Sequence, residues 1–175
     1  MATNANTGQF FPVETIDFGA GGTPDSFNEA TLPVMDVLGV VTQYNGKAYR
    51  LVQHDKGTGS VATVAGGSAY WKTKASFIVT MDETDAEFSL NSVAGGYLRV
   101  VTDQYYCFIQ IGGRQTLVTV AAGTAIGDML SGSATDGVLA KTAVSTASVN
   151  LCVAIAVTAV SSSTSTVEWL IGATL

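Results

Sequence analysis

Alternating apolar and polar residues near the C-terminus give the clearest structural pattern in the sequence. In residues 149–159 every odd position is Val, Leu, Ile or Ala, whereas the even positions are generally smaller or more polar. This period of two is typical of a β-strand, despite alanines that would also suit a helix. A polar turn at residues 161–165 leads into residues 166–171, where Val167, Trp169 and Ile171 share one face. The pattern predicts two strands joined by a turn.

A β-hairpin is predicted around Asn45-Gly46, because both residues tolerate the positive φ angles of a two-residue turn. Its arms are residues 37–44 and 47–53. Along the second arm, one face carries Tyr49, Leu51 and Gln53, and the other carries Ala48, Arg50 and Val52.

Four more runs have strand-like composition, at residues 70–80, 97–102, 105–111 and 115–121. We expect the second and third of these to form a hairpin around Asp103-Gln104, preceded by a break at Gly95-Gly96 and closed by Gly112-Gly113. Residues 81–92 suit either a short helix or a turn before a strand. Strands that recur about every ten residues, with glycine turns between them, predict a mainly-β fold: a small antiparallel β-barrel or sandwich.

The first 33 residues differ from the rest, because they show neither strand nor helix periodicity. They are rich in Gly, Asn and Thr and carry four phenylalanines: Phe10, Phe11, Phe18 and Phe27. We therefore expect an extended N-terminal arm at residues 1–33 and a β-barrel or sandwich domain at residues 34–175. Aromatic residues spaced along an extended segment favour docking on a surface over a free terminus.

Composition is unusual and leaves two interpretations of the protein surface open. Hydrophobic residues make up 47% of the 175 residues, but charged residues only 13%, which is about half of the usual share. Either neighbouring molecules cover part of the surface, or the surface is an ordinary β-protein surface made polar by Thr and Ser. The net charge of −6 argues against nucleic-acid binding through phosphates.

Charge is also unevenly distributed. Residues 1–36 contain five acidic residues and no Lys or Arg, which gives −5. Residues 37–74 carry five cations against Asp55 alone, which gives +4; the cations are Lys47, Arg50, Lys56, Lys72 and Lys74. Either neighbouring copies attract one another through these regions or the charges are simply solvated.

No catalytic or metal-binding motif is present, so we expect neither an enzyme nor a cofactor. The one histidine, His54, is expected to lie on the surface. The acidic run at residues 82–87 lacks the glycine and the distal glutamate of a helix–loop–helix calcium site, and a solvated acidic turn is expected there. Six aromatic residues suit either a carbohydrate-binding platform or the barrel core: Tyr70, Trp71, Tyr97, Tyr105, Tyr106 and Trp169.

Both cysteines, Cys107 and Cys152, lie in apolar runs and are expected to be free and buried. The N-terminus lacks the basic start of a leader peptide. The longest apolar stretch, residues 149–160, is too short to span a bilayer as a helix. We therefore expect a soluble protein made in a reducing cytoplasm, with no membrane partner.

The residues from Gly95 onward resemble the small head decoration, or cement, proteins of tailed bacteriophages. The resemblance is carried by YYCFIQIGG at residues 105–113, GTAIGDML at 123–130, TDGV at 135–138, residues 153–160 and VEWLI at 167–171. Upstream, YNGKAYR at residues 44–50 is similar to the first hairpin of these proteins. The arm at residues 1–33 has no counterpart in the resemblance.

The resemblance implies a structural virion protein that binds the exterior of the expanded capsid, commonly as a homotrimer. Its partners would be the major capsid protein and further copies of itself, and it would stabilise the capsid by bridging adjacent capsomers. The candidate interface residues are Phe10, Phe11, Phe18 and Phe27 as anchors, with Lys47, Arg50, Lys72 and Lys74 as basic contacts. The alternatives are a phage tail, baseplate or receptor-binding component, or a carbohydrate-binding β module.

Overall fold

The computed structural model describes residues 38–88, 92–142, 152–160 and 163–172. These ranges are mainly β, as predicted. The strands are β1 (Val41–Tyr44), β2 (Lys47–His54), β3 (Ser68–Thr73), β4 (Ile78–Thr80), β5 (Val93–Tyr97), β6 (Tyr106–Thr119), β7 (Met129–Gly132), β8 (Leu139–Lys141), β9 (Ala154–Ala156) and β10 (Thr164–Trp169). Two 3-10 turns, η4 (Lys74–Ser76) and η5 (Glu83–Asp85), flank β4. The predicted arm, with its four phenylalanines, lies outside the described residues.

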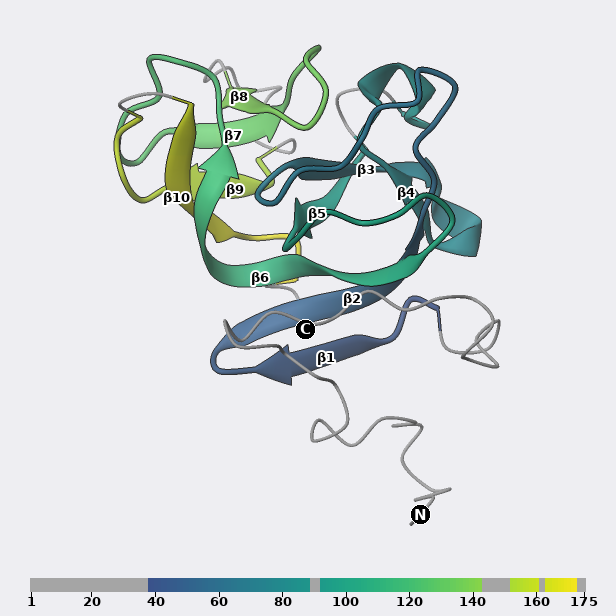
Figure 1. The fold of residues 1–175 in the computed structure, drawn as a ribbon. Helices are drawn as coiled ribbons and strands as arrows, with labels where there is room; N and C mark the ends of the chain where they lie inside the picture. The colour runs from purple at the N-terminus through teal and green to yellow at the C-terminus, as the bar shows by residue number, and fades with distance from the viewer. Residues whose placement is uncertain (1–37, 89–91, 143–151, 161–162, 173–175) are drawn as a thin grey trace.

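Five strands close into a small barrel (Figure 1). Their order is β2-β4-β3-β5-β6, and the ring closes because β6 pairs with β2 as well as with β5. The pairings are antiparallel except for β2 with β4, which is parallel. The barrel prediction is thus confirmed, with one parallel pair that the sequence did not indicate.

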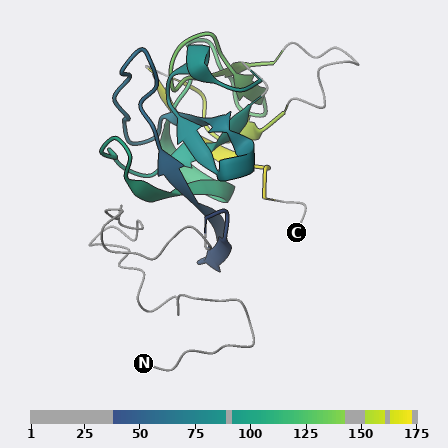
Figure 2. The ribbon, with the colours of Figure 1, turned by 90° about the vertical axis from the view of Figure 1, so that its right-hand side faces the viewer.

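The hairpin predicted at Asn45-Gly46 is confirmed as β1–β2. Both turn residues have positive φ, 49° and 72°, and Tyr44 stands opposite Lys47 in the register. Figure 2 shows this hairpin extending from one end of the barrel. β1 therefore extends the sheet beyond the closed ring, because it pairs only with β2.

Strand β6 is longer than predicted, because Gly112-Gly113 bends it instead of ending it. Gly113 has φ 76°, and a Cβ there would lie 2.6 Å from the Gly46 carbonyl oxygen. A glycine can make such a bend while the hydrogen-bond ladder continues on both sides. The first half of β6 pairs with β2 and β5, and the second half pairs with β10.

Two other predicted boundaries were wrong. Gly95 and Gly96 lie inside β5, and this strand ends at Tyr97. Of the hairpin arm expected at residues 97–102, residues 98–102 therefore form a loop. The run at residues 70–80 is two antiparallel strands, β3 and β4, joined by η4 and by Phe77 in the left-handed region (φ 54°). The sequence does not signal this turn, because Phe77 adopts the left-handed conformation that Gly or Asn usually supplies.

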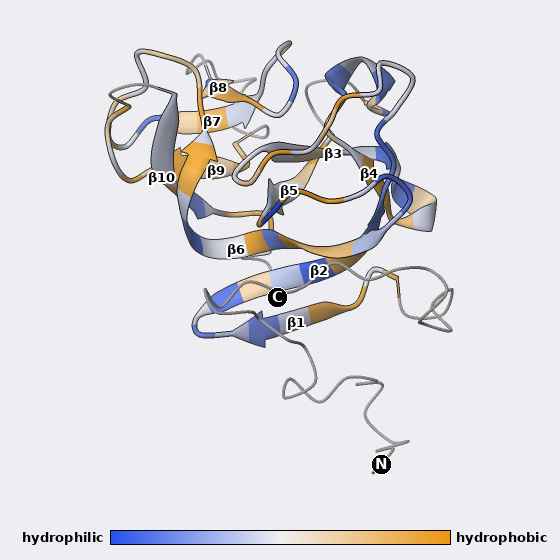
Figure 3. Ribbon diagram, viewed as in Figure 1, coloured by the Kyte–Doolittle hydropathy of each residue, from blue (hydrophilic) through white to orange (hydrophobic). Residues whose placement is uncertain are grey.

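A second sheet, in the order β10-β9-β7-β8, continues from β6 beyond the barrel. A core cluster that includes Tyr70, Val118, Leu139 and Trp169 packs behind it. The Trp169 indole N–H donates to Gln115 Oε1 at 2.7 Å, which fixes β10 against β6. Figure 3 shows apolar residues along β6, β7 and β9 in this region.

The C-terminal strand pair is confirmed as β9 and β10, although β9 is shorter than predicted and residues 149–151 lie outside the described ranges. The small residues Ala154 and Ala156 are buried, whereas Ile155 between them is half-buried. The inward face of this strand is therefore made by its smaller side chains.

Candidate interaction surfaces

The four basic candidates lie in the barrel strands β2 and β3 and in the turn η4. Lys47 starts β2, Arg50 follows in the same strand, Lys72 lies near the end of β3, and Lys74 starts η4. Lys47 and Lys74 form no ion pair with any described residue, whereas Arg50 and Lys72 are engaged within the fold. Phe10, Phe11, Phe18 and Phe27 lie outside the described residues.

Arg50 packs on an aromatic ring of the barrel. Its guanidinium carbon lies 5.7 Å from the ring centroid of Trp71, and Phe77 makes an edge contact with the same ring at 6.3 Å. Arg50 Nε is buried and has no hydrogen-bond partner among the described residues. Burial lowers the pKa of Arg50. Stacking of this kind stabilises a cation that has lost part of its hydration. Arg50 therefore contributes to packing within the barrel and is a weaker candidate for contact with a partner.

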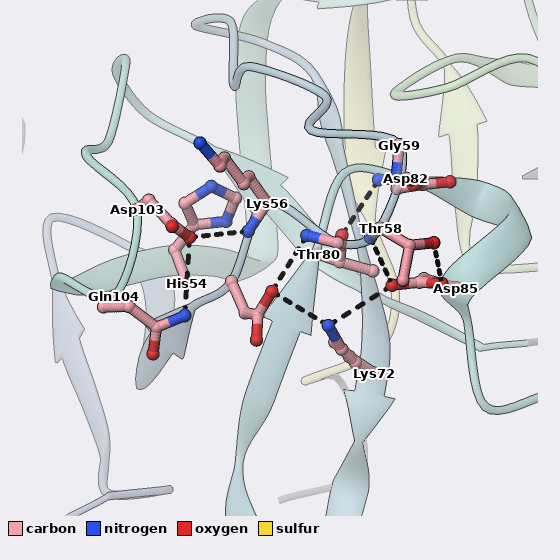
Figure 4. Close-up of polar contacts among 12 residues, drawn as sticks. His54, Lys56, Thr58, Gly59, Lys72, Thr80, Asp82, Asp85, Asp103 and Gln104 are labelled. Carbon is pink, nitrogen blue, oxygen red and sulfur yellow. Dashed lines mark hydrogen bonds and ion pairs between the residues drawn. The ribbon is translucent and has the colours of Figure 1, made fainter.

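Lys72 lies at the centre of a polar network between two loops (Figure 4). Its Nζ lies 2.9 Å from Asp55 Oδ1 and 3.2 Å from Asp85 Oδ2. Burial acts to lower the pKa of Lys72, but these two carboxylates outweigh that effect and raise it. Hydrogen bonds from Thr58 lower the pKa of Asp85, with Lys72 adding to the effect. The charge of Lys72 is therefore already balanced within the chain.

The glycine-rich link after β2, residues 57–67, is hydrogen-bonded to carboxylates of the turn at residues 82–85. The N–H and the hydroxyl of Thr58 donate to Asp85 at 2.8 Å each, and the Gly59 N–H donates to Asp82 at 2.9 Å. Asp82 also accepts from the N–H and hydroxyl of Thr84 and is only 2% exposed. Glu87 of this acidic run is exposed. The expectation of a solvated turn is wrong for Asp82 and Asp85, because their carboxylates supply hydrogen-bond partners to an irregular loop backbone.

His54 is buried, which corrects the expectation of a surface histidine. It is 1% exposed, and its Nδ1 lies 2.9 Å from the hydroxyl of Tyr97 inside the barrel. Burial lowers the pKa of His54 and outweighs the opposing effects of Asp103 and Asp55. His54 ends β2 on its inward face, a position that the alternation of β2 indicates.

The two cysteines are free, as predicted, but only Cys107 is buried, since Cys152 is half-buried. Burial raises the pKa of Cys107 to about 12. A thiol in that state is a poor nucleophile.

The aromatic residues that would form a carbohydrate platform are mostly in the core. Of the six, only Tyr105 is not fully buried; the exposed fractions of the others are Tyr70 0%, Trp71 5%, Tyr97 0%, Tyr106 2% and Trp169 1%. A sugar ring stacks on an exposed aromatic face, and these rings do not offer one.

Three exposed aliphatic side chains, two on neighbouring loops and one near the end of β6, form a feature that sequence reasoning missed. Val64, Val100 and Leu117 are 45%, 65% and 70% exposed. We call them the aliphatic triplet. For Leu117 the sequence did carry a signal: adjacent residues of a strand point to opposite faces, so Leu117 points outward where Val118 points inward.

Backbone and side-chain hydrogen bonds hold the three segments of the aliphatic triplet side by side. Thr63 Oγ1 accepts from the Val101 N–H at 2.6 Å, and the Gly66 N–H donates to the Tyr97 carbonyl at 2.9 Å. The Thr119 N–H donates to the Gly66 carbonyl at 2.9 Å. Leu117 itself has φ 58°, a left-handed conformation that is unfavourable for a leucine. The two loops and the end of β6 therefore present these side chains on a hydrogen-bonded backbone.

No family model matches the chain, and no curated protein matches it. Within the described ranges, no group of three or more His, Cys, Asp or Glu residues could hold a metal ion. The same ranges contain no helix long and apolar enough to cross a membrane.

Proposed function

We propose that this chain is a structural virion protein of a tailed bacteriophage, which binds the outside of the expanded head and stabilises it by bridging adjacent capsomers. The resemblance of residues 95–172 to head decoration proteins supplies the partner, the major capsid protein. The proposal includes self-association as a homotrimer.

The observation that carries a protein-binding role is the aliphatic triplet. Covering large aliphatic side chains that stand in water on a hydrogen-bonded backbone is favourable, because their apolar surface is removed from water. The low charged fraction of the chain, 13%, acts in the same direction, because interface centres are depleted in charged residues. A contact that is weak for one copy holds more strongly when the linked copies of a trimer engage one head together.

The arm and the free cations complete the proposed interface. Phe10, Phe11, Phe18 and Phe27 are candidate anchors, since aromatic side chains bury a large area at low entropic cost. Among the basic candidates, Lys47 and Lys74 remain without an ion pair in the described part of the chain, so they are better placed than Arg50 or Lys72 to meet an acidic capsid surface.

Co-sedimentation with purified phage heads tests the proposal. The protein should sediment with empty expanded heads, and less with unexpanded ones. Leu117→Asp combined with Val100→Asp should lower occupancy on expanded heads. Ile126→Asp is a matched control, because Ile126 is also 70% exposed but lies on the separate turn before β7. Absence of binding to any head form, or binding to isolated tails instead, would contradict the proposal.

A further inference from the structure

The outward face of the β2–β6 pair is apolar although it lies outside the barrel. Its residues are Tyr49, Leu51, Tyr106 and Phe108, which form a cluster separate from the barrel interior. Leu51 stands directly opposite Phe108 in the register. We call these four residues the outer face.

The outer face is almost completely shielded from water. Its four residues are 1–4% exposed. An aromatic side chain buries roughly 150–250 Å² when it is fully covered, and neighbours within one sheet shield its flanks but not its top. Within the described ranges, the apolar residues packed against this cluster are Leu38, Val40 and Leu98, each only partly buried. A further layer is needed to account for the burial.

The chain enters the described part of the fold on this same face. The Leu51 N–H donates to the Val40 carbonyl at 3.0 Å, and the Gly39 N–H donates to the Leu51 carbonyl at 2.8 Å. Leu38 and Val40 both pack on the outer face. The residues that directly precede Leu38 therefore begin at the edge of the surface that needs a cover.

The composition of these preceding residues fits the surface. Residues 27–37 contain five large apolar side chains, Phe27, Leu32, Val34, Met35 and Val37. They also carry Glu29 and Asp36, and no Lys or Arg. Lys47 has no ion pair among the described residues, and it lies on the same side of β2 as Tyr49, because residues two apart in a strand share a face. An extended segment of this length reaches up to about 36 Å, enough to cross two strands.

We propose that the outer face is the docking surface for residues 27–37 of the same chain, with their apolar side chains covering Tyr49, Leu51, Tyr106 and Phe108 and their carboxylates near Lys47. This inference stands independently of capsid binding. It assigns Phe27 and Lys47 to contacts within the chain, and leaves Phe10, Phe11 and Phe18 as the anchors and Lys74 as the basic contact for a partner.

Tyrosine nitration in the full-length protein, read by mass spectrometry, tests this assignment. In the wild-type protein Tyr49 and Tyr106 should resist tetranitromethane. In the variant Phe27→Ser/Val34→Ser/Met35→Ser both should be nitrated roughly tenfold faster or more, because loss of the cover opens them locally. Tyr70 and Tyr97, buried in the other two clusters, should stay unreactive and show that the barrel remains folded.

The matched control is Phe10→Ser/Phe11→Ser/Phe18→Ser, which should leave Tyr49 and Tyr106 protected. Unchanged protection of both tyrosines in the first variant, or equal loss in the control, would overturn the assignment. Protection that falls on dilution of the wild-type protein would also overturn it, because a second copy would then supply the cover. None of these measurements depends on capsid binding, so the docking of residues 27–37 and the proposed function can be refuted independently.

Discussion

Strands β2 and β9, near opposite ends of the described chain, both alternate inward and outward side chains. Their outward faces differ in how far they are buried. In β2 the inward side chains include Ala48 and Val52, and in β9 they are Ala154 and Ala156. In both strands the larger apolar residues point outward. On β2 these are almost fully buried, whereas Ile155 on β9 and its neighbour Val157 remain half-buried.

The comparison shows that alternation identifies a strand but not the face that lies inward. In these two strands the inward face carries the smaller apolar residues, although other barrel strands place Trp71 and Tyr97 in the interior. Whether the bulky face is then exposed depends on a further layer. The outer face of β2 and β6 has such a layer in our account, and β9 has at most a partial one.

The largest effect is expected for Phe108→Ala on the outer face. Loss of a buried phenylalanine typically costs about 3–5 kcal/mol of unfolding free energy. Ile155→Ala on β9 is the matched variant and should cost less than about 2 kcal/mol, because Ile155 already has partial contact with water. Urea denaturation measures both, and equal losses would show that the two outward faces do not differ.

Removal of Asp82 should come next. Asp82→Ala removes the buried carboxylate that accepts from the Gly59 and Thr84 N–H groups in part-buried hydrogen bonds, which we expect to cost about 1–2 kcal/mol. The comparison is Asp128→Ala in the turn before β7, where the carboxylate accepts from the Ala125 N–H near the surface. Thermal unfolding should show the smaller shift for Asp128→Ala; the opposite order would mean that the loop after β2 does not depend on its carboxylates.

A third prediction concerns acid sensitivity of the barrel. The folded-state pKa of His54 is lowered, so the unfolded chain binds a proton first, near its ordinary pKa of about 6.5. Stability contributed by neutral His54 is therefore complete above this value and is lost as the pH falls below it. His54→Asn, which retains a polar atom near Tyr97, should flatten the dependence of unfolding free energy on pH between 7 and 5.5. An unchanged slope would contradict the buried position.

The smallest effect is expected for Lys72→Gln. Its ion pairs with Asp55 and Asp85 are about a quarter exposed or less, and such pairs contribute about 1 kcal/mol or less. Both carboxylates have lowered pKa values in the fold, so their contribution is present above about pH 4 and is lost as the pH falls through the folded-state pKa values. The variant should reduce the loss of stability on acidification below pH 4. A loss well above 1 kcal/mol at pH 7 would mean that Lys72 supports more than these two pairs.

Local signals predicted those elements whose chemistry is local. Asn45-Gly46 gave the first hairpin, and the alternation around Trp169 gave the last strand, because turn type and strand period depend on neighbouring residues alone. The bend at Gly113 and the turn at Phe77 were missed, since both are set by strands far away in the sequence. His54 was misplaced because its partner, Tyr97, lies 43 residues away.

The candidate surfaces also divide into features that neighbouring residues determine and features that only the tertiary structure shows. Alternation in β2 correctly grouped Tyr49 with Leu51, but only the tertiary structure shows that this face is buried and that Arg50 is stacked on Trp71. The aliphatic triplet comes from three segments that the barrel brings together, and no local pattern relates Val64 to Val100.

Heat survival of expanded heads, with and without the protein bound at saturation, tests the central claim of capsid stabilisation most directly. The account predicts that decorated heads release their capsomers at a higher temperature, because contacts bridging adjacent capsomers must be broken first, and that Leu117→Asp combined with Val100→Asp reduces this gain. Heads that carry the protein at full occupancy and still come apart at the temperature of bare heads would contradict it.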